Sequence, residues 1–251
     1  MNIFEQVWSW LTDPDNWTRS INGPGIPYHV LKHLQYTGVA ILIAALIAVP
    51  LGIYIGHTGR GSFLVVGIAN SFRAIPELGL LILLVLAMGI ALAVEAVTIA
   101  LVSLAIPPLL AGTYAGIRNV DRDVVDAARG MGMREWDVVW RVELPIALPL
   151  ILGGLRAATL QVIATASIAA FVSLDGLGRF VIDGRAFGAD GGYAMMAGGA
   201  VLIAALAIAV ELVLAGVQRL AVSPGLQTRR MRRRVARVWA QPKLITAEES
   251  S

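Results

Sequence analysis

The chain has 251 residues, of which 57% are hydrophobic and only 15% are charged. A soluble domain is about one-quarter charged, so this composition excludes an ordinary soluble protein and indicates that most of the surface faces lipid. The absence of cysteine excludes a disulfide framework, a thiolate metal site and a cysteine nucleophile. The formal net charge of +3 comes from arginines beside apolar segments, which indicates a membrane surface as the partner and not nucleic acid.

The N-terminal segment, residues 1–33, is predicted to be amphipathic and to lie on the outer side of a membrane. Its acidic residues precede any basic residue and no long apolar core follows, so it is expected to stay on the mature protein and not to act as a secretory signal. Trp10 and Trp17 add rings that favour the headgroup layer. A frayed terminus is the alternative. The residues predicted to share one helical face are Ile3, Phe4, Val7, Trp8 and Leu11.

Five apolar stretches are predicted to cross the bilayer, since a helix needs about 20 residues to span its hydrocarbon core. The continuous apolar run from Leu78 to Gly116 is too long for one span and is expected to fold back near Gly89. Glycines spread through the apolar segments are expected at helix packing contacts. The predicted fold class is an all-α membrane protein with about five transmembrane helices, at residues 37–56, 63–89, 92–117, 146–174 and 195–220.

The basic residues predict the orientation of the chain, because cytoplasmic loops retain arginine and lysine. Of the 20 basic residues, 14 fall on the side that holds the loop after the third span and the tail. We therefore expect the N-terminus outside and the C-terminus in the cytoplasm. The predicted organisation is a transmembrane domain over 34–222, followed by a basic cytoplasmic tail over 223–251.

The loop between the third and fourth spans, residues 118–145, is longer than a simple connector. Asp121 and Asp123 are predicted to open a helix that ends at Gly130 and Gly132. A second helix is predicted over 135–143, with Pro145 starting the return into the membrane. Its predicted apolar face carries Trp136, Val139 and Trp140. The pattern indicates a docking device on the cytoplasmic surface, and a solvated charged linker is the alternative.

One motif in this loop resembles a known family signature. The sequence reads Asp126-Ala127-Ala128, three residues, Gly132, nine residues, and then Val142-Glu143-Leu144-Pro145. It is similar to the EAA signature of permeases in binding-protein-dependent ATP-binding-cassette importers, in which Glu usually stands where this chain has Asp126. The resemblance implies a type I importer permease fold, like that of methionine importers, with a cytoplasmic coupling helix. It also implies that ATPase coupling involves Asp126, Ala127, Ala128, Gly130, Gly132, Leu144 and Pro145.

A narrower resemblance, over about Leu31 to Leu220, is to the osmoprotectant branch of these permeases. It is carried by several short runs, among them Ala74–Leu78, Gly116–Asp121, Gly154–Arg156, Gln161–Ala166 and Gly176–Gly178. The resemblance implies import of glycine betaine, choline, carnitine or a related quaternary amine across the cell membrane. The open alternatives are a permease for another small solute such as an amino acid, a passive channel and an intramembrane scaffold.

The resemblance also implies which partners the chain needs. They are a cytoplasmic ATP-binding subunit, an extracytoplasmic substrate-binding protein, and a second permease that is a copy of this chain or a sister chain, all assembled in the lipid bilayer. No partner role for nucleic acid is expected. The chain lacks a Gly-x-x-x-x-Gly-Lys phosphate loop, so we expect no ATPase activity and no other catalysis in it. We also expect no cofactor and no metal site, because the three histidines form no spaced ligand set.

Polar residues inside the spans are the candidates for the solute path. Ionisable residues at membrane depth are functional candidates by default, although Arg73 can instead snorkel or seal a helix break together with Glu77. Polar residues of the fourth span can equally bond neighbouring helices. Glu211, about two turns from Arg219, is expected to be interfacial. The predicted pathway residues are Arg73, Pro76, Glu77, Gln161 and Thr165.

Overall fold

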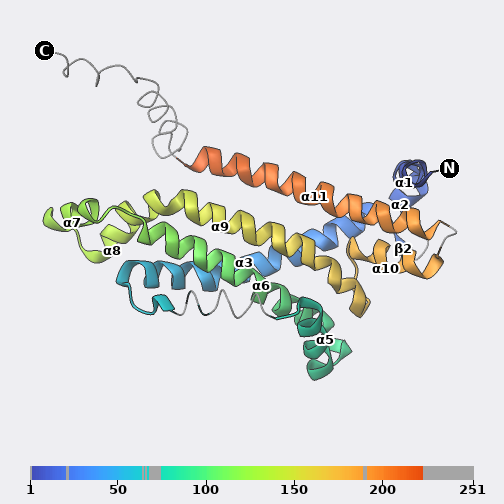
Figure 1. Cartoon of the computed structure of the whole chain (residues 1–251), viewed down its shortest axis with the longest axis horizontal. Coiled ribbons are helices and arrows are strands. Elements are labelled where there is room, and N and C mark those ends of the chain that lie inside the picture. The colour runs from blue at the N-terminus through green and yellow to red at the C-terminus, as the bar shows by residue number, and fades with distance from the viewer. Residues whose placement is uncertain are drawn as a thin grey trace, which may run out of the picture.

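The computed structural model describes residues 2–20, 23–63, 65, 67, 75–188 and 191–222. Within these ranges the chain is helical apart from connecting turns and one short antiparallel strand pair, so the predicted all-α class is confirmed (Figure 1). The elements in chain order are α1 (Ile3–Thr12), α2 (Pro14–Thr18), β1 (Arg19–Ser20), β2 (Gly23–Pro24), α3 (Ile26–Thr58), α5 (Glu77–Met88), η1 (Ile90–Leu92), α6 (Ala93–Arg118), α7 (Arg122–Gly130), α8 (Glu135–Val138), η2 (Val139–Glu143), α9 (Leu144–Thr165), η3 (Ala166–Val172), α10 (Gly178–Phe187) and α11 (Gly192–Ala221).

Four helical stretches in the described part of the chain are long and apolar enough to cross a membrane. They contain α3, α6, α9 and α11, and they match the first, third, fourth and fifth predicted spans. The second predicted span falls partly on residues outside the described ranges, and its described part is the 12-residue helix α5. Gly89 has a φ of +87° and turns the chain from α5 into η1, so the predicted fold-back at this glycine is confirmed.

Small residues let α3, α6 and α9 approach one another closely. A Cβ atom on Gly52 of α3 would stand 2.7 Å from the Cβ of Thr113 in α6. A Cβ atom on Gly112 of α6 would stand 2.7 Å from the Cα of Gly154 in α9. Lipid gives helices no hydrophobic reason to associate, so membrane helices pack through such close contacts. The buried face of α3 repeats a small residue every fourth position, at Ala40, Ala44, Ala48, Gly52 and Gly56.

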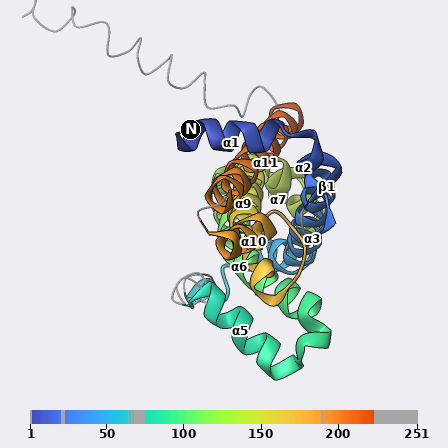
Figure 2. The same cartoon turned by 90° about the vertical axis from the view of Figure 1, so that its right-hand side faces the viewer.

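The short helices that flank this bundle lie at its two ends. Figure 1 places α7 and α8 at one end, and α1, α2 and α10 at the other. The helix α11 runs along the side of the bundle, and no residue in its most apolar window is buried inside the chain. Figure 2, which looks along the bundle, shows α1 lying across the bundle axis, as a helix on a membrane surface would.

Trp10 packs onto the helix bundle, a contact that the sequence did not predict. Its ring is half-buried and packs edge-to-face on Phe180, with ring centroids 5.2 Å apart. A Cβ atom on Gly198 of α11 would lie 2.3 Å from the same ring, so only glycine fits there. Trp10 therefore anchors α1 to the bundle, whereas Phe4 and Trp8 on the same helix stay exposed.

Candidate functional site

The loop over 118–145 contains the predicted helix, bend and helix. Asp121 is the N-cap of α7, and its side chain accepts a hydrogen bond from the backbone N–H of Asp123 at 3.0 Å. Gly130 is the last residue of α7, and Gly132 has a φ of +85°. Because side chains with a Cβ rarely adopt this backbone region, the bend depends on Gly132 and not on Gly130.

The second helix of the loop differs from the prediction at its C-terminal end. It was expected to be separate from the fourth span, but helix is continuous from Glu135 to Val172. The π turn η2 joins α8 directly to α9, and Pro145 lies in the first turn of α9. Proline has no backbone N–H to donate to the helix. The π turn before Pro145 already departs from the regular helical hydrogen-bond pattern, so proline costs little helix stability at this position. Helix therefore runs from the loop into α9 without a break at Pro145.

The two alanines of the signature face opposite ways. Ala128 is 2% exposed and packs with Val120, Val125 and Val138 in a small apolar cluster inside the loop. Ala127 is exposed, and so is Asp126 beside it. The methyl group of Ala128 is therefore covered by this chain, whereas that of Ala127 is open to solvent. Ala128 lies three positions after Val125, so the two residues share one face of the helix. This spacing is the sequence pattern that could have predicted the burial of Ala128.

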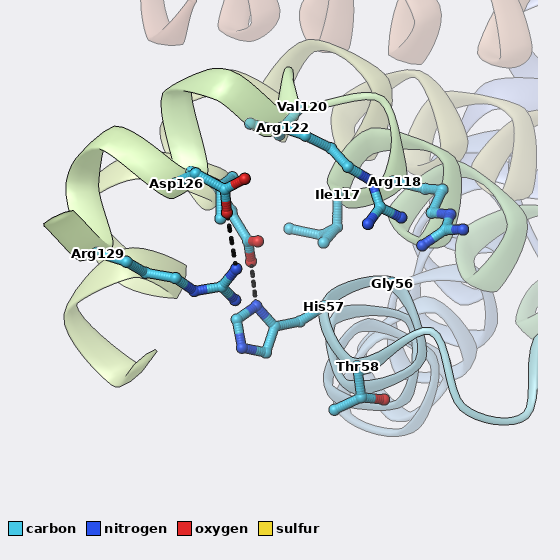
Figure 3. A pocket seen from close by; sticks show the side chains of 11 residues that line it. Gly56, His57, Thr58, Ile117, Arg118, Val120, Arg122, Asp126 and Arg129 are labelled. Carbon is cyan, nitrogen blue, oxygen red and sulfur yellow. Dashed lines mark hydrogen bonds and ion pairs between the residues drawn. The ribbon is translucent and has the colours of Figure 1, made fainter. Parts of the chain in front are cut away.

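A charged network ties the loop to the end of α3 (Figure 3). Arg129 donates two hydrogen bonds of 2.9 Å to the carboxylate of Glu135 and lies 3.3 Å from Asp126. Hydrogen bonding to Glu135 raises the pKa of Arg129 above its ordinary value. His57 of α3 then contacts two carboxylates, at 2.8 Å from Glu143 and 3.2 Å from Glu135. The network joins α7, α8, η2 and α3 into one unit.

This network could not be read from the sequence, because its central pair lies 86 positions apart in the chain. Glu143 belongs to the signature but was not predicted as a coupling residue. Its side chain is buried, with 5% exposed, and it bonds to His57. Leu144 is half-buried against the cluster around Ile117, and Pro145 is exposed. In the sequence, a carboxylate flanked by apolar residues indicates that Glu143 needs a charged or hydrogen-bonding partner, but not which one.

Two of the predicted pathway residues meet in the structure. The hydroxyl of Thr165 donates a hydrogen bond of 3.0 Å to the carboxylate of Glu77. Thr165 ends α9, where the helix tightens into the 3₁₀ turn η3, and Pro76 caps the start of α5. Gln161 is exposed one turn before Thr165. Arg73 lies outside the described residues.

A second intramembrane pair was not predicted. Arg156 of α9 forms an ion pair with Glu211 of α11 and donates a hydrogen bond of 2.7 Å to Gln218. The expectation that Glu211 is simply interfacial beside Arg219 is therefore incomplete, since it binds across to another span. Opposite charges in two spans are themselves a sequence signal, because ionisable residues at membrane depth pair with one another.

Two histidines in the N-terminal half of α3 hold other segments in place. The Nε2 of His33 lies 2.8 Å from the carbonyl oxygen of Ile163 in α9. The backbone N–H of Gly176 donates to Nδ1 of His29 at 3.3 Å, and the His29 ring packs edge-to-face on Phe180. Both rings therefore link α3 to later parts of the chain.

Comparison with known proteins gives a consistent result. Residues 48–227 match the family described as binding-protein-dependent transport system inner membrane component. The carnitine transport permease protein OpuCD of Listeria monocytogenes is 36% identical over 198 residues, which cover 79% of this chain and 87% of that protein. The choline transport system permease protein OpuBB of Bacillus subtilis is 32% identical, covering 82% of this chain and 93% of that protein.

The fold is also found among solved structures. The inward-facing MetNI methionine ABC transporter superposes with a TM-score of 0.68 at 20% identity, covering 78% of this chain and 96% of the matched chain. An amino acid ABC transporter crystallised with histidines gives a TM-score of 0.52 at 21% identity, covering 77% and 91%. At these identities the likeness concerns the fold alone, and it confirms the predicted methionine-importer-like architecture.

Proposed function

This chain belongs to the family of binding-protein-dependent transport system inner membrane components, and from that premise we propose that it is the membrane-spanning permease of an ATP-driven importer for a small quaternary amine. Glycine betaine, choline and carnitine are the proposed solutes. The observation that carries this proposal is the 32–36% identity to carnitine and choline permeases over about four-fifths of the chain. The methionine-importer likeness supports the fold but not the solute.

The chain is proposed to work with three kinds of partner. A cytoplasmic subunit hydrolyses ATP, a second permease completes the pathway, and an extracytoplasmic binding protein delivers the solute. Few aromatic side chains lie within the spans, and cations of this kind are recognised mainly by aromatic faces. We therefore assign recognition of the quaternary ammonium group mainly to the binding protein.

Coupling is proposed to run through the loop over 118–145. The exposed face of α7, which includes Ala127 and Asp126, is the surface offered to the ATPase. The buried Ala128 and the ion pair of Arg129 with Glu135 hold α7 firmly on the rest of the loop. Since helix continues from α8 into α9, a push on α7 moves a membrane span directly. Asp126, Gly130, Gly132, Leu144 and Pro145 shape this unit.

The solute path is proposed to pass the contact between Glu77 and Thr165, near Gln161 and Pro76, and Arg73 is kept as a pathway residue predicted from sequence alone. A carboxylate beside the path favours a cation over a neutral solute. Choline carries a net positive charge, whereas glycine betaine is a zwitterion. Glu77→Gln should therefore lower choline uptake more than glycine betaine uptake, while Gln161→Leu affects both alike. Equal losses of both solutes in Glu77→Gln would refute a charge-selecting role.

The orientation is proposed from the arginine distribution, with the N-terminus outside and the C-terminus in the cytoplasm. The cysteine-free sequence makes the test simple. A cysteine introduced by Ser20→Cys should react with a membrane-impermeant thiol reagent applied to intact cells. One introduced by Ser250→Cys should react only after the membrane is opened. Labelling of both positions from outside contradicts the proposed topology.

The solute assignment is tested by uptake into vesicles. The chain is purified from its native membrane together with its associated subunits, and reconstituted with ATP inside the vesicles. We expect ATP-dependent uptake of radiolabelled choline, glycine betaine or carnitine. Competition by methionine without competition by any of the three amines would reject the quaternary-amine proposal and leave the permease assignment standing.

A further inference from the structure

A polar pocket lies at the cytoplasmic base of the loop, where α3, α6 and α7 meet (Figure 3). Its volume is about 140 Å³. The acidic residues that line it are already engaged, Asp126 with Arg129 and Glu143 with His57. Arg118 and Arg122 also line it, and in the part of the chain that the structure describes neither forms an ion pair. The pocket thus offers two uncompensated cations.

The two guanidinium groups share one side of the pocket. Figure 3 shows Arg118 and Arg122 reaching toward the last turn of α3. The Nη1 atom of Arg118 lies 3.5 Å from the position that a Cβ atom on Gly59 would occupy, which places it at the end of that helix. Paired guanidinium groups bind phosphate through charge-assisted hydrogen bonds. The pocket is therefore suited to an oxyanion.

An apolar groove also borders this end of α3. Its volume is about 520 Å³, and its lining is mostly apolar, with His57, Thr58 and Glu135 as the polar exceptions. Trp136 and Trp140 form its rim, with ring centroids 5.9 Å apart, and are 71% and 56% exposed. The remaining apolar walls come from α3 and η2, at Val49, Pro50, Ile53, Tyr54 and Val139.

The pocket and the groove are adjacent, since His57 and Thr58 line both. We propose that together they bind one anionic phospholipid of the cytoplasmic leaflet, with its phosphate against Arg118 and Arg122 and an acyl chain in the groove. Exposed tryptophan rings lie at the depth of lipid headgroups, and the cytoplasmic leaflet supplies anionic lipid. A second copy of this chain is a less suitable occupant, because its net charge of +3 would repel Arg118 and Arg122.

This inference rests on the proposed orientation, and it deepens the account of the coupling loop. The bound lipid would brace α7 against α3 at the place where the loop joins the spans. It requires neither ATP nor solute, so its failure can be told apart from failure of the transport proposal.

Native mass spectrometry of the purified full chain tests the proposal, with phosphatidylglycerol, phosphatidylcholine and inorganic phosphate as probes. The wild type should retain phosphatidylglycerol over phosphatidylcholine. A double variant, Arg118→Gln with Arg122→Gln, should bind phosphatidylglycerol about tenfold to thirtyfold more weakly, from the contribution of each basic residue near an anionic surface. Trp140→Ala should weaken it as well, through loss of the groove wall.

The matched control removes two arginines of the same loop outside the pocket, by Arg134→Gln with Arg141→Gln. It should bind phosphatidylglycerol within about threefold of the wild type, as diffuse surface charge contributes little at moderate salt. Equal weakening in both double variants would overturn the proposal and indicate diffuse attraction. So would equal retention of phosphatidylcholine by the wild type, or saturation of the site by inorganic phosphate regardless of Trp140. The wild-type comparisons decide the matter even if a variant fails to fold.

Discussion

The two ends of the helix bundle are attached to the membrane spans by different interactions. At the end that holds α1 and α10, which the proposed orientation makes the outer end, Phe180 is 1% exposed and packs against the rings of Trp10 and His29, with centroids 5.2 and 4.9 Å away. At the end that holds α7 and α8, which the proposed orientation makes the inner end, His57 ties the loop to α3 through two carboxylates, the exposed Glu135 and the buried Glu143.

This difference has mechanical consequences. A buried aromatic cluster loses its whole stabilisation when its members separate, so the outer end behaves as a fixed cap. Exposed ion pairs exchange with water at little cost in free energy. At the inner end the contact of His57 with the exposed Glu135 can therefore break at little cost, whereas its contact with the buried Glu143 and the apolar cluster around Ala128 hold the loop in place.

The largest expected loss of stability comes from the outer cap. Phe180→Ala should lower the free energy of unfolding by about 3 kcal/mol, because it leaves a cavity among buried rings. Phe187→Ala is the control, since Phe187 is 40% exposed on the same helix. Unfolding in detergent, followed by circular dichroism, provides the measurement. Equal losses in the two variants would show that the ring cluster does not hold the outer end.

A smaller loss is expected where the inner network is buried. Glu143→Ala leaves His57 without its nearest carboxylate and should cost about 2 kcal/mol, as for a buried hydrogen-bonding group that loses its partner. Glu135→Ala removes the other carboxylate that contacts His57, but Glu135 is 62% exposed and its loss should cost less. The same unfolding measurement applies. A greater loss for Glu135→Ala would reverse the assignment of the buried contact.

The bend of the loop should be more tolerant still. Gly132→Val forces a β-branched residue into positive φ and should cost about 1–2 kcal/mol of local stability. Gly130→Val is the control, because Gly130 has an ordinary helical backbone and open space around its Cα. Proteolysis of the loop in detergent should be faster only in Gly132→Val. Uptake should fall with it, since the second helix is misdirected.

The parts of the fold that depend on local sequence were predictable. Apolar length predicted the four spans that the structure describes, Asp121 predicted the start of α7, and the glycines predicted the turns at Gly89 and Gly132. These features follow from helix caps and backbone conformation, which involve only neighbouring residues.

The contacts between distant segments could not be predicted in the same way. His57 with Glu143, Thr165 with Glu77 and Arg156 with Glu211 each join residues more than 50 positions apart. The sequence marks such residues as needing partners, but only the packing of helices decides which partner each one meets. The path residue Arg73 falls outside the described ranges, so its pairing with Glu77 is still a prediction.

The most direct test of the account concerns the neighbouring alanines of α7, which the structure separates into an exposed and a buried position. Ala127→Arg should leave the unfolding free energy unchanged, because its side chain projects into solvent, yet it should abolish ATP-driven uptake and release the ATPase on pull-down. Ala128→Arg should instead destabilise the loop by disrupting the cluster around Val138. Normal uptake with bound ATPase in Ala127→Arg would contradict the claim that the exposed face of α7 couples ATP hydrolysis to transport.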